Sequence, residues 1–252
     1  AIGRNALTVQ QITFTEGGGV YNNDPTITHT ADARIVVGLA VSGTGIPAGA
    51  TVASVTDGTH FELSASTTGG SLTGQTLTFT GGQDAYNTAV GYNAGAVTTT
   101  GINNTLVGGL AGDALTTGGK NVAIGYAALS TEDTKNYAVA IGYQALTSQN
   151  ADADTYNVAI GYKAGEAVST GVYNTLIGGL AGDALTNGQR NVAIGYSALS
   201  TEDGHGYNVA IGARALETLN ANANAYNVAI GVEAGLAMTT GLYNTIVGSN
   251  AL

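Results

Sequence analysis

A short apolar phrase recurs along the chain from residue 86 to the end. The phrase Y-N-V-A-I-G, or a close variant of it, occurs ten times, and successive copies are 17 or 19 residues apart. Repetition at a fixed interval is typical of stacked coils that each contact only their neighbours. The pattern therefore predicts an all-β fold whose main part, residues 83 to 252, is a parallel β-solenoid (β-roll) of about ten coils of 17 to 19 residues.

The apolar positions of each phrase predict a strand with two apolar faces. Side chains alternate along a strand, so Val122 and Ile124 point to one side and Ala123 points to the other. The place of Ala123 is occupied in the other coils by Ala, Leu or Ile and never by a polar residue. Strands that are apolar on both faces are normally buried on both. One face can fill the coil, and we expect an identical neighbouring chain to cover the other.

Two further repeat positions hardly vary, and we expect both to form ladders through the stack. Four residues before the Gly that closes the phrase there is an Asn, whose amide is expected to bond the amide of the next coil. The Asn residues are Asn87, Asn104, Asn121, Asn157, Asn174, Asn191, Asn208, Asn227 and Asn244, with Ala138 as the exception. Three residues after the Gly there is an Ala, as expected where a neighbour approaches closely. The Ala residues are Ala94, Ala111, Ala128, Ala145, Ala164, Ala181, Ala198, Ala215, Ala234 and Ala251. Together with the two apolar faces, the Ala row predicts a parallel homotrimer.

Nearly all the tyrosines lie at two repeat positions. Tyr86, Tyr137, Tyr156, Tyr173, Tyr207, Tyr226 and Tyr243 start the phrase, and Tyr92, Tyr126, Tyr143, Tyr162 and Tyr196 follow the Gly. Stacked aromatic rows favour a structural role, although exposed Tyr also binds sugars and proteins.

The repeats resemble those of a known family. N-V-A-I-G-Y-A-A-L-S-T (121 to 131) and Y-N-V-A-I-G-Y-K-A-G (156 to 165) resemble the head repeats of trimeric autotransporter adhesins. They are equally similar to the same repeats in phage tail fibres. The resemblance covers residues 83 to 252 and implies a parallel β-roll trimer, although the coils here are longer than the shorter adhesin repeat.

The periodicity is absent between residues 8 and 82. Residues 1 to 7, A-I-G-R-N-A-L, match the second half of one more coil, so the repeat is interrupted and then resumes. The interrupting segment alternates in short β-like runs, and Asp57-Gly58 is typical of a hairpin turn. We therefore expect an inserted β-sandwich or small barrel. Its phrase V-S-G-T-G-I-P-A-G (41 to 49) resembles a module that recurs in phage structural proteins.

Composition narrows the function classes. Gly is 39 of 252 residues, Trp is absent and only 10% of the residues are charged, which favours a packed array over a disordered chain. A net charge of −10 repels nucleic acid and anionic lipid surfaces. The sequence contains no apolar run long enough to predict membrane insertion. The lack of Cys excludes disulfides and thiolate metal sites.

Few residues in the sequence are candidates for catalysis or metal binding. Glu132-Asp133 and Glu202-Asp203 occupy equivalent places in two four-coil blocks that align with one another. Paired carboxylates could hydrolyse glycosides, but a copy in each block indicates duplication of a solvated turn, and Glu132→Ala is expected to be nearly silent. We expect no enzyme activity and no catalytic, cofactor-binding or metal site.

These features predict a structural fibre protein of a virion, such as a phage tail fibre or a similar appendage, with a rigid trimeric shaft that attaches to a host. The alternative is the head of a trimeric adhesin on a bacterial outer surface. The expected partners are two copies of the same chain and a host-surface glycan or protein. Receptor contacts are expected in the non-repeating segment, at Tyr21, His29, His60 and Phe61.

Overall fold

The computed structural model describes residues 2–4, 6, 12–32, 34–81 and 86–252. Within these ranges the chain is all-β, with sixteen strands and no helix. It divides into two compact units. The inserted unit is Gln10–Asp84, and the solenoid comprises Ala1–Val9 together with Ala85–Leu252.

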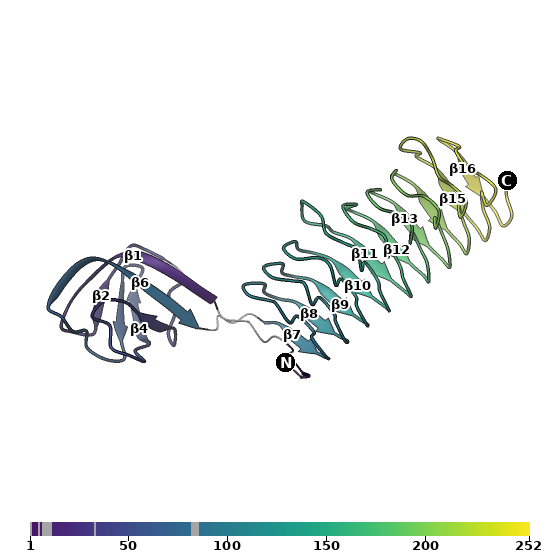
Figure 1. Cartoon of the computed structure of the whole chain (residues 1–252). Coiled ribbons are helices and arrows are strands. Elements are labelled where there is room, and N and C mark those ends of the chain that lie inside the picture. The colour runs from purple at the N-terminus through teal and green to yellow at the C-terminus, as the bar shows by residue number, and fades with distance from the viewer. Residues whose placement is uncertain (1, 5, 7–11, 33, 82–85) are drawn as a thin grey trace. The chain divides into compact units, whose positions relative to one another are not determined.

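The solenoid carries ten strands, β7 to β16, in one parallel sheet (Figure 1). Each strand pairs in register with the strand of the next coil, so that Val122 lies beside Val139 and Ala123 beside Ala140. The predicted parallel β-solenoid is therefore confirmed, with about nine full turns between the first strand and the last. The strands are β7 (Thr88–Val90), β8 (Thr105–Val107), β9 (Val122–Ile124), β10 (Val139–Ile141), β11 (Val158–Ile160), β12 (Thr175–Ile177), β13 (Val192–Ile194), β14 (Val209–Ile211), β15 (Val228–Ile230) and β16 (Thr245–Val247).

The core of the solenoid lies inside the coils and is built mostly of Ala and Leu. The middle residue of each strand, such as Ala123 or Leu106, points into this core and is fully buried. The Ala row belongs to the same core, and Ala128 and Ala145 in it are also fully buried. The row therefore packs inside its own chain. The expectation that it marks the approach of a neighbouring chain is wrong, because these side chains pack in the core of the chain's own coils.

The Gly that closes each phrase is required by the backbone. At Gly125 the φ angle is +134°, a region that L side chains rarely adopt. A Cβ on Gly125 would also lie 2.3 Å from the carbonyl oxygen of Gly142 in the next coil. Both conditions repeat from coil to coil, so any side chain here would push two coils apart.

The Asn side chains tie each coil to the backbone of the next one. Oδ1 of Asn104 accepts the N–H of Asn121 at 2.9 Å, and Nδ2 of Asn104 donates to the carbonyl oxygen of Gly118 at 2.9 Å. Asn174 and Asn191 make the same two kinds of bond. The expected ladder is present, but most of its bonds run from amide to backbone. The amide-to-amide bond that we expected occurs between Asn244 and Asn227, where Nδ2 of Asn244 donates to Oδ1 of Asn227 at 3.1 Å. The amide-to-backbone bonds satisfy buried backbone groups where no strand partner is available.

The single exception in the Asn row has a structural reason. Ala138 and Asn208 occupy equivalent places in the two blocks, and a 19-residue coil follows each of them. At Asn208, Oδ1 accepts the N–H of Asn227 at 3.3 Å, while Nδ2 has no partner among the described residues. A buried donor without a partner is costly. Ala138 avoids that cost in the equivalent coil.

Residues near the start of the chain also pair with the solenoid. Ile2 forms a parallel bridge with Val90, its N–H donating to the carbonyl oxygen of Ala89 at 2.8 Å. The N–H of Asn93 donates to the carbonyl oxygen of Arg4 at 2.9 Å. These bonds have the same pattern as those between later coils.

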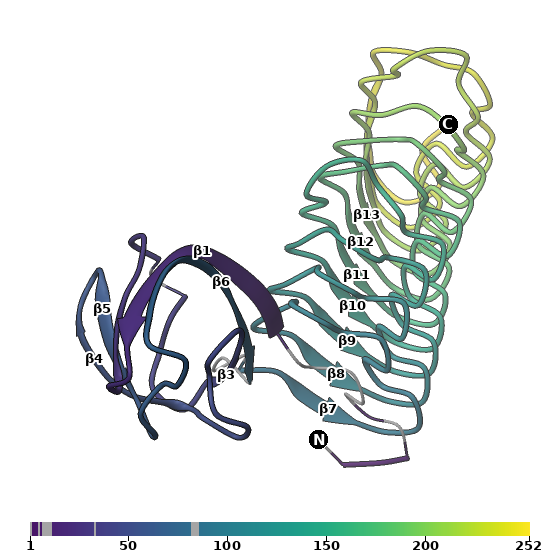
Figure 2. The ribbon, with the colours of Figure 1, turned by 60° about the vertical axis from the view of Figure 1, so that its left-hand side comes forward.

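The inserted unit is one antiparallel sheet in the order β3-β6-β1-β2-β5-β4 (Figure 2). Its outer strands are linked by a bridge between Ala40 and Thr51 and by the N–H of Val52, which donates to the carbonyl oxygen of Leu39 at 2.8 Å. The predicted hairpin at Asp57-Gly58 is confirmed, because β4 and β5 pair on either side of it. The strands are β1 (Ile12–Asn22), β2 (Thr26–Thr28), β3 (Ala40–Ser42), β4 (Val52–Asp57), β5 (His60–Leu63) and β6 (Ser71–Gly81).

Three phenylalanines contact one another in the core of the inserted unit. Phe79 stacks on Phe14 with ring centroids 5.0 Å apart and meets Phe61 edge-on at 5.6 Å. Ile27 and Leu77 are fully buried in the same cluster. This core is closed within residues 12 to 81.

Candidate functional site

The outward side chains of the solenoid strands form an aliphatic face, made of the first and third residues of β7 to β16. None of these residues belongs to the core cluster; most are half-buried, while Thr88, Ile230, Thr245 and Val247, at the two ends of the sheet, are exposed. Neither column contains a charged residue. The first column is Thr88, Thr105, Val122, Val139, Val158, Thr175, Val192, Val209, Val228 and Thr245. The second is Val90, Val107, Ile124, Ile141, Ile160, Ile177, Ile194, Ile211, Ile230 and Val247.

The aliphatic face is continuous because the strands pair in register along the whole sheet. Parallel sheets are normally covered on both faces, yet within the described residues only the inner face of this sheet is covered by the core. A contiguous apolar surface of this kind is typical of an interaction site. The expectation of two apolar strand faces is thus confirmed, one facing the core and one facing outward.

A tyrosine ladder, formed by the residues that start the phrase, runs along the solenoid. Tyr156 stacks on Tyr137 and Tyr173, with ring centroids 4.9 and 5.3 Å apart and rings nearly parallel. Tyr is replaced by Asn103, Lys120 and Arg190 in three of the coils. Nζ of Lys120 donates to the Tyr137 hydroxyl at 2.7 Å, and the guanidinium of Arg190 lies 5.2 Å from the Tyr173 ring centroid. Cations therefore continue the stack through contact with the rings.

The tyrosines that follow the Gly form a shorter ladder. Tyr143 stacks between Tyr126 and Tyr162, at 5.5 Å from each. Gly109 and Gly179 interrupt it. In both ladders the ring faces contact one another, which supports a structural role, while most of the tyrosines stay exposed.

The two acidic turns are not solvated as expected. Glu132 and Glu202 are both fully buried. Oε1 of Glu132 accepts the N–H of Lys135 at 3.0 Å, and Oε1 of Glu202 accepts the N–H of His205 at 3.0 Å. Burial raises the pKa of the Glu132 carboxyl, against backbone donors that lower it. Each carboxylate accepts hydrogen bonds within its own turn, so the expectation that these carboxylates are solvated is wrong. We therefore now expect Glu132→Ala to be destabilising.

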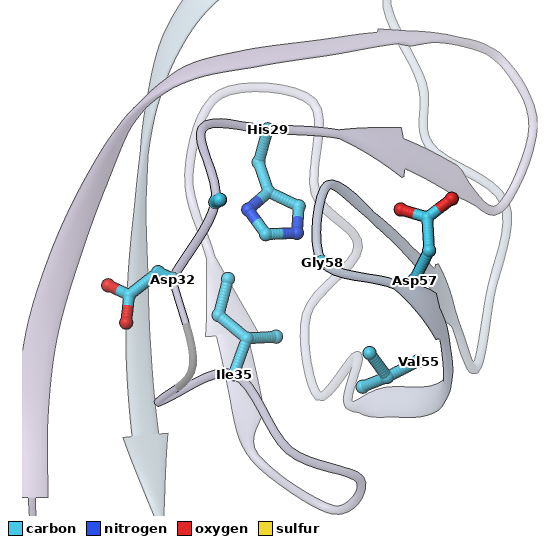
Figure 3. A pocket seen from close by; sticks show the side chains of 7 residues that line it. His29, Asp32, Ile35, Val55, Asp57 and Gly58 are labelled. Carbon is cyan, nitrogen blue, oxygen red and sulfur yellow. The ribbon is translucent and has the colours of Figure 1, made fainter.

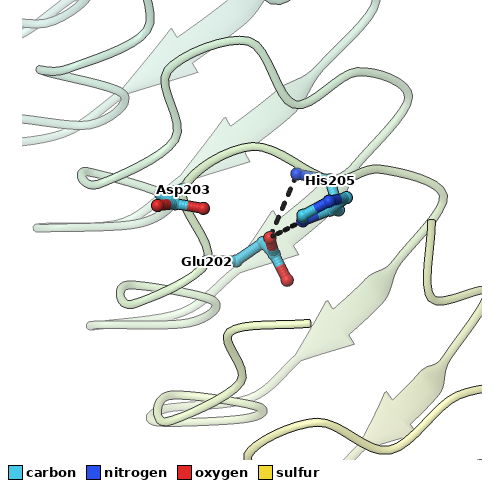
Figure 4. A group of neighbouring side chains, drawn as sticks. All are labelled: Glu202, Asp203 and His205. Carbon is cyan, nitrogen blue, oxygen red and sulfur yellow. Dashed lines mark hydrogen bonds and ion pairs between the residues drawn. The ribbon is translucent and has the colours of Figure 1, made fainter. Parts of the chain in front are cut away.

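One group of side chains has the composition of a metal site. Glu202, Asp203 and His205 each offer a ligand atom within 4.8 Å of the others, and no other such group occurs among the described residues (Figure 4). Nδ1 of His205 lies 3.2 Å from Oε1 of Glu202, and Oε2 of Glu202 accepts the N–H of Ala221 at 3.0 Å. Both carboxylate oxygens are therefore occupied by the chain's own donors. In the equivalent turn Lys135 replaces His205, so the group is not a repeated feature.

Two of the four residues expected to contact a receptor lie in the core instead. Phe61 is fully buried and Tyr21 nearly so, with the Tyr21 hydroxyl donating to the carbonyl oxygen of Thr44. Burial raises the pKa of Tyr21. The expectation that these rings are exposed is wrong, because both point into the aromatic core.

The two histidines lie in different settings near one hairpin. His60 is half-exposed, and its Nδ1 lies 2.9 Å from Oδ1 of Asp57. This hydrogen bond, with those of Thr59, lowers the pKa of Asp57 to about 2. His29 is buried against the Phe61 ring, with centroids 5.3 Å apart.

His29 lines a cavity of about 490 Å³ in the inserted unit (Figure 3). The lining residues come from the segment after β2 and from the β4–β5 hairpin: His29, Ala31, Asp32, Ile35, Val55, Asp57 and Gly58. His29 was among the residues expected to contact a receptor, but the cavity could not be expected from the sequence. The turn at Asp57-Gly58 could be predicted, whereas the segment that faces it across the cavity carries no local signal.

Comparisons with known proteins provide no independent assignment. The sequence matches no protein-family model, and neither the curated proteins nor the solved structures give a match. In the part of the chain that the structure describes, no helix is long and apolar enough to cross a bilayer.

Proposed function

We propose that the chain is a structural fibre protein of a virion appendage, in which three parallel solenoids pack together to form a rigid shaft. The observation that carries the proposal is the aliphatic face, which runs along ten strands and is free of charge. Three copies related by a three-fold axis would bring these faces together and cover the outer side of each sheet.

The energetics favour such packing. Burying a Val or Ile side chain completely contributes on the order of 1.5 to 3 kcal/mol, and the half-buried residues of the face would each gain part of this. The gain is repeated at every coil, so many small contributions add along the shaft. The resemblance of the repeats to phage tail fibres and to trimeric adhesin heads supports the same assembly.

The inserted unit supplies the attachment function in this proposal. We take it as a small β-sandwich or barrel, because its single sheet is linked at its outer strands and encloses an aromatic core. It is the part of the chain that does not repeat, so it offers a surface distinct from the uniform coils for recognition of a host-surface glycan or protein.

Measurement of the oligomeric state tests the proposal that three solenoids form the shaft. Native mass spectrometry of the full chain should give a particle of three 25.0 kDa copies, about 75 kDa. Ile194→Asp, on the aliphatic face, should shift the distribution toward single chains, because it places a charge where the copies meet. Thr170→Asp, at an exposed turn, should leave the trimer intact. A folded 25.0 kDa monomer in the unmodified protein would contradict the proposal.

Locating the chain on virions and measuring attachment to host cells test the proposed role as a virion appendage. Antibodies against the chain should label appendages on purified virions by electron microscopy; labelling of a bacterial envelope alone would support the alternative, a cell-surface adhesin head. Deletion of residues 8 to 82 should leave a trimer that no longer attaches to host cells. Normal attachment after the deletion would assign recognition to another part of the fibre.

A further inference from the structure

The cavity in the inserted unit has the size of a small-molecule site. Its volume of about 490 Å³ lies within the range of 300 to 1,000 Å³ that is usual for ligand pockets. Ile35 and Val55 provide apolar walls on opposite sides, as Figure 3 shows. Val55 is exposed, so the cavity opens to solvent on that side.

His29 provides a hydrogen-bond acceptor that the chain itself does not use. Its Nδ1 donates to the carbonyl oxygen of Thr30, so in the neutral imidazole Nε2 is the nitrogen that can accept a hydrogen bond. Nε2 is buried and has no hydrogen-bond partner among the described residues. In Figure 3 the side of the ring that carries Nε2 is turned toward Gly58 and the space between the hairpin and Ile35. A ligand hydroxyl that donates to Nε2 would satisfy this buried group.

The charges at the cavity are already paired. Asp57 is bound to His60 and Thr59, and Asp32 is bound to Arg34, whose Nε lies 2.9 Å from Oδ1 of Asp32. Figure 3 shows the Asp32 carboxylate turned away from the imidazole. The guanidinium of Arg34 also lies over the Phe14 ring, 4.4 Å from its centroid. Among the residues that the structure describes, no Lys or Arg lines the cavity.

We propose that this cavity binds a neutral pyranose of a surface glycan. The C–H face of such a ring would lie against Ile35 and Val55, and one hydroxyl would donate to Nε2 of His29. A sugar acid would place its carboxylate near two aspartates without a free cation to pair with it. An amino sugar would find both carboxylates already paired. The inference rests on the proposed attachment role of the inserted unit and names the ligand class.

Saturation-transfer NMR on the full chain tests the proposal. The probes are the methyl glycosides of glucose, galactose, mannose and N-acetylglucosamine, with galacturonate, N-acetylneuraminate and glucosamine as charged counterparts. At least one neutral glycoside should bind about tenfold more tightly than every charged sugar. Val55→Trp should abolish its binding by filling the cavity, and His29→Phe should weaken it about tenfold while keeping the contact with Phe61.

Val20→Trp is the matched control. Val20 lies on β1 outside the cavity and is 40% exposed, close to the 41% of Val55. It should leave sugar binding unchanged. Absence of binding by all neutral glycosides, tighter binding of a charged sugar, or equal binding by Val55→Trp would overturn the inference.

The outcome is separable from that of the proposed function. If no neutral sugar binds but deletion of residues 8 to 82 still abolishes attachment, the inserted unit attaches by another surface and only the cavity assignment fails. If a neutral sugar binds in the cavity and the deletion mutant attaches normally, the cavity assignment holds and the proposed attachment role fails.

Discussion

The solenoid and the inserted unit build their cores in different ways. The solenoid encloses a narrow core of mostly Ala and Leu and ties its coils together by backbone and Asn hydrogen bonds. The inserted unit packs Phe14, Phe61 and Phe79 around one centre. The stability of the solenoid is therefore distributed over many equivalent contacts, whereas that of the inserted unit depends on a few large side chains.

The largest effect on stability is expected from a substitution in the core of the inserted unit. Phe79→Ala removes the ring that contacts both Phe14 and Phe61, and should destabilise the inserted unit by about 3 to 5 kcal/mol. Hydrogen exchange followed by mass spectrometry should show faster exchange throughout residues 12 to 81 and unchanged exchange in residues 122 to 230. Faster exchange in the solenoid strands would show that the two units depend on one another.

Overpacking the narrow core should have the next largest effect. Ala128→Leu adds volume at a fully buried position between coils and should cost about 1 to 3 kcal/mol, with the loss extending to neighbouring coils. Ala213→Leu is the control, since this half-exposed position holds Tyr in other coils. Thermal unfolding followed by circular dichroism should separate the two variants; equal midpoints would contradict the inside and outside assignment.

A smaller effect on stability is expected in the Asn row, where two Asn→Ala variants can be compared with each other. Asn191 makes two bonds, from Nδ2 to the carbonyl oxygen of His205 and from the N–H of Asn208 to Oδ1, while Asn208 uses only its Oδ1. Asn191→Ala should cost about 1 to 3 kcal/mol in unfolding free energy, and Asn208→Ala clearly less. Denaturant titration of both variants measures the difference. A larger loss for Asn208→Ala would refute the explanation offered for Ala138.

The smallest expected effect is a dependence on pH. Burial raises the pKa of Glu132 in the folded chain above its unfolded value, so the folded state keeps this proton to higher pH. The stability from this group is present below the unfolded pKa, about 4.3, and is lost as the pH rises through the folded pKa. Glu132→Gln should flatten that part of the pH–stability profile, whereas Asp152→Asn, at an exposed position, should not. Identical profiles for Glu132→Gln and the unmodified chain would exclude this account.

The repeat made the solenoid predictable, because a period that persists over ten copies identifies equivalent positions. The alternation in V-A-I placed Ala123 and Val122 on opposite faces, and the Asn row marked a ladder between coils. Amide-to-backbone bonding in that ladder could not be predicted, since it depends on which carbonyl the next coil brings near. Glu132 was misplaced for a similar reason: a carboxylate in a turn is normally solvated, and only the fold shows the turn closing over it.

Less of the inserted unit than of the solenoid could be predicted from the sequence. Its β character and the hairpin at Asp57-Gly58 follow from local signals, but the burial of Tyr21 and Phe61 and the cavity beside His29 do not. By itself the sequence determined the solenoid and its repeat positions, because these depend on periodicity. Only the tertiary structure decided that the Ala row packs inside its own chain and that His29 and Val55 line one cavity, because such relations arise when segments distant in sequence fold against each other.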